Sequence, residues 1–196
     1  MLKRKPFWGV VLIVISVIIL ISSGLGIYNL IRGPKSYEEL GGVDSGGRYV
    51  QAEISIIFDI FMEETSERGE VTGAYAIIPY GDEYYMLLYI PAEYMDSAQQ
   101  IFEDTTSYLD GELDKLGSYC VVRGTIRAIN NDDLSEAYLD RMEGLEDYAL
   151  GYVLEVGTVG YLPTGWVIAL TAISTVCLVS GVVLVVFDLR KKKEAA

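Results

Sequence analysis

The sequence predicts an α+β domain between two membrane-spanning helices, and three observations support this fold class. Each end of the chain carries a long stretch without a charged residue: residues 7–31 make 25 positions and residues 165–187 make 23. The segment between them, residues 32–164, holds 8 basic and 26 acidic side chains, a formal charge of −18. Within it, stretches with an apolar residue at every second position alternate with stretches of helical spacing, which indicates strands and helices in one domain.

The two uncharged stretches are long enough to cross a bilayer. At 1.5 Å rise per residue, each exceeds the ~20 residues that span ~30 Å of hydrocarbon. The first stretch also resembles a secretory signal peptide, because Lys3, Arg4 and Lys5 precede it and small residues end it. It is longer than the ~7–15 apolar residues of a signal peptide, and no Ala-x-Ala pattern follows. We therefore expect an uncleaved membrane anchor.

The basic residues at the chain ends predict the orientation in the membrane. Seven of the 15 Lys and Arg residues lie within residues 1–6 and 188–196, and basic flanks are retained in the cytoplasm. The sequence therefore predicts a cell-membrane protein with two spans, both termini cytoplasmic and the middle segment outside. The expected regions are a basic tip at 1–6, a transmembrane helix at 7–31, an extracytoplasmic acidic domain at 32–164, a second transmembrane helix at 165–187 and a basic tail at 188–196.

Small residues recur on one face of each predicted transmembrane helix. Such faces allow two helix backbones to approach closely, so the helices are expected to pack as a hairpin or to dock on another protein. Small residues are also common in membrane helices in general. The alternative is therefore that these residues have no role in helix packing. The residues concerned are Gly9, Ser16 and Ser23 in the first helix, and Thr171, Ser174, Cys177 and Gly181 in the second.

The first half of the middle segment predicts three strands. Apolar residues such as Val50, Ala52 and Ile54 alternate with polar ones over residues 48–62, which indicates a long strand with one buried face. Two apolar, Tyr-rich runs at 74–80 and 83–90 are separated by a Gly-Asp pair, which predicts a hairpin.

The second half predicts two helices and two more strands. Pro91 opens a helix that extends to residue 109, and residues 118–129 form a strand in which Cys120 is expected to face inward and be buried. Residues 130–133 resemble a cap for a second helix through residue 147, and residues 148–156 form the last strand.

Three strands, a helix, a strand and a later strand are the element order of a five-stranded antiparallel OB-like barrel. The second helix is an addition to that plan. A twisted antiparallel sheet with both helices on one face would have the same element order, so both architectures remain open.

Three runs of sequence also resemble a family of uncharacterised bacterial (Firmicutes-type) two-pass membrane proteins with an OB-like extracytoplasmic domain. The runs are YVQAEISIIFDIFMEE at 49–64, AYAIIPYGDEYYMLLYIP at 74–91 and VVRGTIRAI at 121–129. The resemblance covers nearly the whole chain. It implies the arrangement of two helices around an outer domain, and it implies no chemistry.

The composition argues against several classes of activity. The chain has no histidine, which excludes Ser-His-Asp and Cys-His catalysis and His-ligated zinc within it. It also has no glycine-rich phosphate loop, and the acidic middle segment repels nucleic acid. We therefore expect no enzymatic activity, no cofactor, no metal site and no nucleic-acid partner.

Two acidic clusters offer an alternative to that expectation. A carboxylate-dependent hydrolase or a calcium site would use such groups. A solvated acidic surface is the simpler explanation for the first cluster, which lacks the residue spacing of a calcium-binding loop. The second cluster is explained by capping of a helix N-terminus, where acidic residues are favourable. The clusters are Glu63, Glu64, Glu67 and Glu70, and Asp132, Asp133 and Glu136.

Tyrosine is the other excess, with 14 of the chain's 15 in the middle segment. Exposed tyrosines and arginines on a sheet suit the binding of protein or polymer, although tyrosine is also simply a good strand former. The expected binding face comprises Tyr75, Tyr80, Tyr84, Tyr85, Tyr89, Arg123 and Arg127.

These patterns lead to three hypotheses of function. The first is an extracytoplasmic module that binds another membrane or envelope protein, or an envelope polymer, next to the lipid bilayer. The second is a small accessory subunit that docks on a transporter or secretion complex through its transmembrane helices. The third is the hydrolase described above. The sequence indicates neither an oligomeric state nor a ligand.

Overall fold

The computed structural model describes residues 5–37 and 46–194. The chain divides into two compact units, a helical unit made of Met1–Arg32 with Tyr161–Ala196, and a sheet domain made of Gly33–Gly160. The glycine-rich bend expected after Tyr37 and most of the basic tip expected at residues 1–6 lie outside the described residues.

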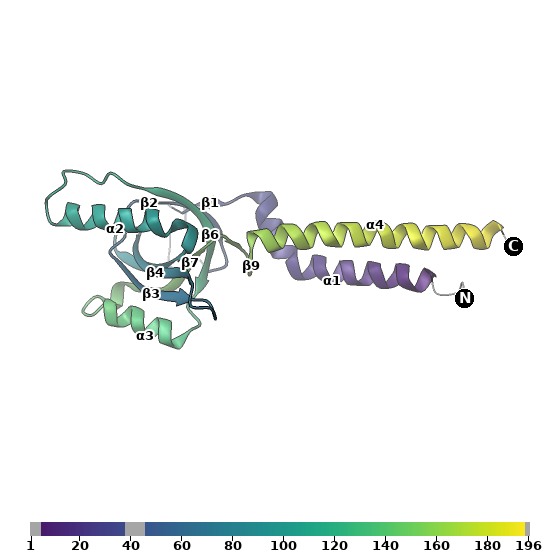
Figure 1. Ribbon diagram of the computed structural model, residues 1–196, viewed down its shortest axis with the longest axis horizontal. Coiled ribbons are helices and arrows are strands. Elements are labelled where there is room, and N and C mark those ends of the chain that lie inside the picture. The colour runs from purple at the N-terminus through teal and green to yellow at the C-terminus, as the bar shows by residue number, and fades with distance from the viewer. Residues whose placement is uncertain (1–4, 38–45, 195–196) are drawn as a thin grey trace. The chain divides into compact units, whose positions relative to one another are not determined.

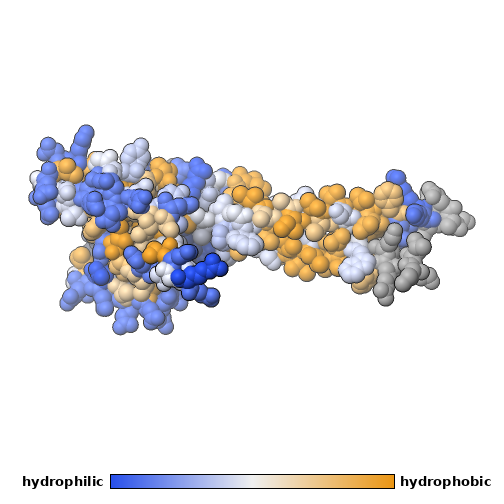
Figure 2. Space-filling model, viewed as in Figure 1, coloured by the Kyte–Doolittle hydropathy of each residue, from blue (hydrophilic) through white to orange (hydrophobic). Residues whose placement is uncertain are grey.

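The helical unit contains the two long helices that the uncharged stretches predict. Helix α1 covers Lys5–Arg32 and helix α4 covers Thr164–Glu194. Their segments Phe7–Arg32 and Thr164–Lys191 are long and apolar enough to cross a membrane. Most side chains of these segments are not buried within the protein, and hydrophobic residues cover the visible face of the pair (Figure 2). The two helices therefore present an apolar surface to their surroundings.

The sheet domain is built on seven strands among the described residues, which form one mixed sheet (Figure 1). Its order is β1-β2-β6-β7-β5-β4-β3, and two neighbouring pairs, β1–β2 and β5–β7, are parallel. The strands are β1 (Lys35–Ser36), β2 (Tyr49–Ile54), β3 (Asp59–Thr65), β4 (Val71–Tyr80), β5 (Tyr84–Pro91), β6 (Cys120–Ala128) and β7 (Ala149–Val156).

Two helices pack on opposite sides of this sheet (Figure 1). Helix α2 (Met95–Leu109) follows a short 3-10 turn, η2 (Ala92–Tyr94), and packs on the larger core cluster; helix α3 (Asp132–Arg141) packs on a second cluster. The two clusters lie on opposite faces of the sheet, because successive side chains along a strand point to opposite faces. The remaining elements are η3 (Glu146–Tyr148), β8 (Thr158–Val159) and β9 (Leu162–Pro163).

The predicted five-stranded antiparallel barrel is wrong, and so is the alternative with both helices on one face. The strand expected at 48–62 is split: β2 ends at Ile54 and β3 begins at Asp59. These two strands lie towards opposite ends of the strand order, and no described pairing joins β3 to β1 or β2. The linker of residues 55–58 spans at most roughly 17 Å at ~3.5 Å per residue. The sheet is therefore strongly curled, but it does not close.

Helix α2 supplies the reason for the split. The backbone N–H of Ile57 donates to the hydroxyl Oγ1 of Thr105 at 3.3 Å, so a helix side chain replaces the partner that a neighbouring strand would provide. Ile57 is then fully buried, whereas strict alternation from Ile54 would bury Ile56 instead. The alternation of buried and exposed side chains is interrupted here. The chain then crosses from β2, near one end of the strand order, to β3 at the other end.

Candidate functional site: a slot where the sheet stays open

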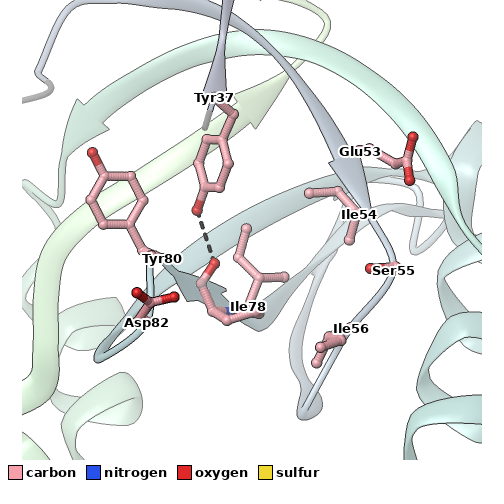
Figure 3. Close-up of a pocket in the computed structure, with 10 residues that line it drawn as sticks. Tyr37, Glu53, Ile54, Ser55, Ile56, Ile78, Tyr80 and Asp82 are labelled. Atoms are coloured by element: carbon pink, nitrogen blue, oxygen red, sulfur yellow. Dashed lines mark hydrogen bonds between the residues drawn. The ribbon is translucent and has the colours of Figure 1, made fainter. Parts of the chain in front are cut away.

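A cavity of about 480 Å³ opens where the curled sheet fails to close (Figure 3). We call it the slot. One wall comes from the end of β2 and the residues after it, the other from the end of β4 and its turn, and Tyr37 lies between the two walls. The lining residues are Tyr37, Glu53, Ile54, Ser55, Ile56, Ile78, Pro79, Tyr80, Gly81 and Asp82.

The slot exists because the end of β4 has a partner on one side only. The pairing of β3 with β4 starts at Asp59 and Ile77, so residues 78–80 pair with β5 alone. Pro79 has no N–H to offer at this free edge, as expected for proline in a strand. Its carbonyl oxygen accepts a hydrogen bond from the hydroxyl of Tyr37 at 3.0 Å. A side chain thus replaces one missing bond between strands.

Aromatic and aliphatic side chains form the interior of the slot. The rings of Tyr37 and Tyr80 meet edge to face, with centroids 5.2 Å apart. Ile54, Ile78 and Tyr80 belong to the core cluster under α2, so the floor of the slot is the domain core. Burial raises the pKa of the Tyr37 hydroxyl above its ordinary value, which keeps that group neutral.

The rim of the slot is acidic. Glu53 on β2 and Asp82 in the β4–β5 turn are both exposed, and they are the charged residues in the described part of the cavity lining. Lys35 lies two positions before Tyr37 but is not part of the lining. Among the residues that the structure describes, the site therefore combines an apolar floor with two carboxylates and no cationic side chain.

The tyrosine face expected from the sequence is divided between the two sides of the sheet. Tyr80 and Tyr84 lie with the α2 cluster, whereas Tyr75, Tyr85 and Tyr89 lie with the α3 cluster. Alternation along β4 and β5 explains this division, because odd and even positions point to opposite faces. Of the five, only Tyr80 lines the slot.

On the α3 side, part of the expected face forms a polar cluster. The rings of Tyr75 and Tyr89 lie 5.2 Å apart, and the Tyr75 hydroxyl donates to Glu64 Oε1 at 2.8 Å. Next to them, Arg127 Nη1 lies 2.7 Å from Glu155 Oε2. Burial raises the pKa of Glu155, although Arg127 opposes the shift. These groups bond to one another, so they form a preorganised surface rather than a cavity.

Arg123 and Cys120, two further residues considered in the sequence analysis, both lie on β6. Arg123 Nε donates to the side-chain oxygen of Gln51 at 2.8 Å, on the same sheet as the polar cluster. Cys120 is half-buried rather than buried, and burial raises the pKa of its thiol.

The acidic clusters do not contribute to the slot. Glu63, Glu64, Glu67 and Glu70 are exposed along β3 and the following turn, and Asp132 and Asp133 occupy the first turn of α3. At that helix start, the side chain of Asn131 accepts the N–H of Leu134 at 3.3 Å. Within the described residues, no group of three or more Cys, Asp or Glu side chains is arranged to hold a metal ion.

The small-residue faces of the two long helices lie against each other. Gly9, Ser16, Ser23, Ser174 and Gly181 are buried, and Thr171 and Cys177 are half-buried. A Cβ atom built on Gly181 would lie 2.8 Å from the carbonyl oxygen of Gly9, so these backbones are in direct contact. A partner protein that docked on this unit would have to use its other faces.

Sequence reasoning missed most of the slot, because its residues come from separate segments and share no spacing. One signal was available: Pro79 within a strand-forming run indicates a free strand edge. The partner that fills this edge, Tyr37, lies 42 positions earlier in the chain.

Fold and site together define a protein in which two apolar helices, long enough to span a membrane, flank in sequence a mixed-sheet domain with an open slot. The chain belongs to the family described as a domain of unknown function (DUF8577), whose family model matches residues 1–187. That match includes α1, the whole sheet domain and most of α4. No curated protein matches the chain.

Proposed function

We propose that this is a membrane-anchored binding protein, not an enzyme, whose sheet domain takes a ligand into the slot. The observation that carries the proposal is the cavity of about 480 Å³ at the open edge of the sheet. Sites for small ligands typically measure ~300–1,000 Å³ and combine apolar walls with a few polar groups. The slot has this composition. The absence of histidine from the chain favours binding over acid–base catalysis.

We further propose that both helices span the cell membrane, with the termini in the cytoplasm and residues 32–164 outside it. The seven basic residues at the two tips support this orientation. The formal charge of −18 on residues 32–164 disfavours contact with nucleic acid or anionic lipid. The ligand is then a component of the cell envelope, either a protein or a polymer, that reaches the domain from the outer side.

The orientation is tested by cysteine labelling in a Cys120→Ser, Cys177→Ser background. A membrane-impermeant maleimide should label Glu112→Cys in intact cells and label Arg190→Cys only after lysis. Labelling of Arg190→Cys in intact cells, with Glu112→Cys protected, would reverse the proposed topology.

Binding in the slot is tested by photocrosslinking in native membranes. The amino acid p-benzoylphenylalanine is placed at Ser55, which lines the slot, and in a separate variant at the exposed position Glu112. The expected result is an adduct that forms from position 55 and is absent from position 112. Identical adducts from both positions, or none from position 55, would contradict the proposed function.

A further inference from the structure

We propose that the slot takes an alkyl-ammonium group, that is, an aliphatic chain ending in a protonated amine. Such a group occurs on the lysine side chain of a polypeptide and on a free alkylamine. The inference rests on the proposed function and adds the chemical class of the ligand.

The interior of the slot suits the aliphatic part of this group. Ile54 and Ile78 are almost completely buried members of the domain core, and Ile56 adds a third branched side chain to the wall. An alkyl chain in the slot would lose apolar surface to this floor, and Ile56, which is only half-buried, would lose some of its own. Removal of apolar surface from water is the main favourable term in such binding. A strongly polar ligand would gain nothing from this floor.

The charges at the rim determine which sign of charge the ligand carries. Within the described lining, Glu53 and Asp82 carry the formal charges, and both are negative at neutral pH. A carboxylate or phosphate in the slot would be repelled by both, whereas an ammonium group would be attracted to both. The acidic sheet domain as a whole also attracts cations.

The tyrosines add a second attraction for a cation. Aromatic faces attract ammonium groups through the ring quadrupole, and Tyr37 and Tyr80 form one side of the slot (Figure 3). The Tyr37 hydroxyl is already bonded to the oxygen of Pro79, which fixes the ring. In Figure 3, Asp82 lies close below Tyr80 on the turn. This turn passes through Gly81 at φ +64°, a conformation that favours glycine.

The experiment uses the full chain in lipid nanodiscs with ¹³C-methyl methionine and follows the methyl signals by NMR. Met86 reports on the slot, because its sulfur lies 3.2 Å from the Tyr37 hydroxyl. Met142 lies in the α3 cluster on the other side of the sheet and serves as the internal control. Addition of n-butylamine should shift the Met86 signal and leave the Met142 signal in place. The uncharged analogue n-butanol should bind at least about tenfold more weakly, a difference of about 1.4 kcal/mol.

Matched variants test whether the two rim carboxylates are responsible. The double variant Glu53→Gln, Asp82→Asn should weaken n-butylamine binding at least about tenfold, with the Met142 signal showing that the domain is still folded. Glu83→Gln removes an exposed charge from the same turn but outside the lining, so it should change the affinity less than twofold. Equal weakening by Glu83→Gln would overturn the proposal, because the attraction would then be general to the acidic surface.

A peptide arm identifies the source of the ammonium group. The peptide acetyl-Gly-Gly-Lys-Gly-Gly-amide is compared with the same peptide carrying Nε-acetyl-lysine. Binding of the first peptide alone supports a lysine side chain of a polypeptide. Binding of n-butylamine without either peptide would show that the ammonium group belongs to a ligand other than a polypeptide. No Met86 shift with any amine, or an equal shift with n-butanol, would overturn the ammonium inference. The proposed binding function would still stand if the Ser55 crosslink were observed.

Discussion

The hydroxyl group of Tyr37 donates a hydrogen bond to the carbonyl oxygen of Pro79, at 3.0 Å, across the opening of the curled sheet. The same hydroxyl contacts the sulfur of Met86 on β5. One side chain from the segment after β1 therefore contacts two neighbouring strands, β4 and β5. This contact joins the segment after β1 to β4 and β5, two strands with which β1 does not pair.

Replacement of Tyr37 by phenylalanine should weaken the sheet domain by about 1 kcal/mol. The change keeps the ring and removes only the donor, so the carbonyl oxygen of Pro79 loses its partner at a partly buried site. Urea unfolding of the full chain in detergent, followed by near-ultraviolet circular dichroism, measures the effect. Tyr119→Phe is the matched control, because its ring is 63% exposed. Equal stability of the two variants would show that the contact does not stabilise the sheet domain.

Most of the element types and their order were predictable from the sequence, because they depend on local periodicity. Strand β1 was not predicted, and the second helix, expected through residue 147, ends at Arg141. The hairpin of β4 and β5, the helix after Pro91 and the cap at Asn131 all follow from neighbouring residues. The break after Ile54 was not predictable in this way. It depends on the hydrogen bond between Ile57 and Thr105 of helix α2, which are 48 positions apart in the chain.

The candidate site was less accessible to sequence reasoning than the fold. Alternation correctly separates the faces of β4 and β5, but the expected binding face joined Tyr80 and Tyr84 to tyrosines on the other face. The slot depends on which strands fail to pair, and an unpaired edge leaves little trace in composition. The two carboxylates at the rim, Glu53 and Asp82, give no clear signal either, because they are 29 positions apart and the chain has 26 other acidic residues.

Gly124 should be essential for the pairing of β6 with β7. A Cβ atom at this position would overlap the backbone of Glu155, including its carbonyl carbon at 2.7 Å, and backbone cannot move aside as a flexible side chain can. We expect Gly124→Ala to destabilise the sheet domain by about 3 kcal/mol, at the upper end of the usual range for overpacking. The control is Gly151→Ala on β7, where a Cβ atom meets nothing within 4 Å. Urea unfolding of both variants gives the comparison, and a similar cost at the two positions would contradict the role of close backbone approach.

Because Gly9 and Gly181 are in direct contact, we expect a larger side chain at Gly181 to weaken the association of the two long helices. Gly181→Leu would push its side chain into the backbone of α1 and should cost about 1–3 kcal/mol of helix association. Gly24→Leu adds the same side chain where a Cβ atom meets nothing within 4 Å, and it should be tolerated.

Pulsed electron paramagnetic resonance measures this effect in nanodiscs. Spin labels are attached at Val10→Cys and Val183→Cys, two exposed positions, in a Cys120→Ser, Cys177→Ser background. The distance distribution should be narrow in the parent chain and with Gly24→Leu, and broader or longer with Gly181→Leu. An unchanged distribution for Gly181→Leu would show that the two helices do not depend on this contact.

Glu155 should make the sheet domain less stable as pH rises. Burial raises the pKa of its carboxyl group above the ordinary value of 4.5, and the attraction of Arg127 offsets only part of this shift. Because the folded state holds the proton more tightly, the contribution of Glu155 is fully present below about pH 4.5 and is lost as pH rises through the raised pKa.

Titration of the Glu155 side-chain carboxyl carbon by NMR measures this pKa directly. The unfolding free energy of the parent chain should fall relative to that of Glu155→Gln as pH rises, because Gln carries no titrating proton. Glu146 provides a control of opposite sign. It is exposed and accepts the N–H of Gly144 at 3.0 Å, which lowers its pKa, so its contribution is lost as pH falls. If Glu155 titrated below 4.5, the ion pair with Arg127 would outweigh burial. The polar cluster on the α3 side would then favour its charged form.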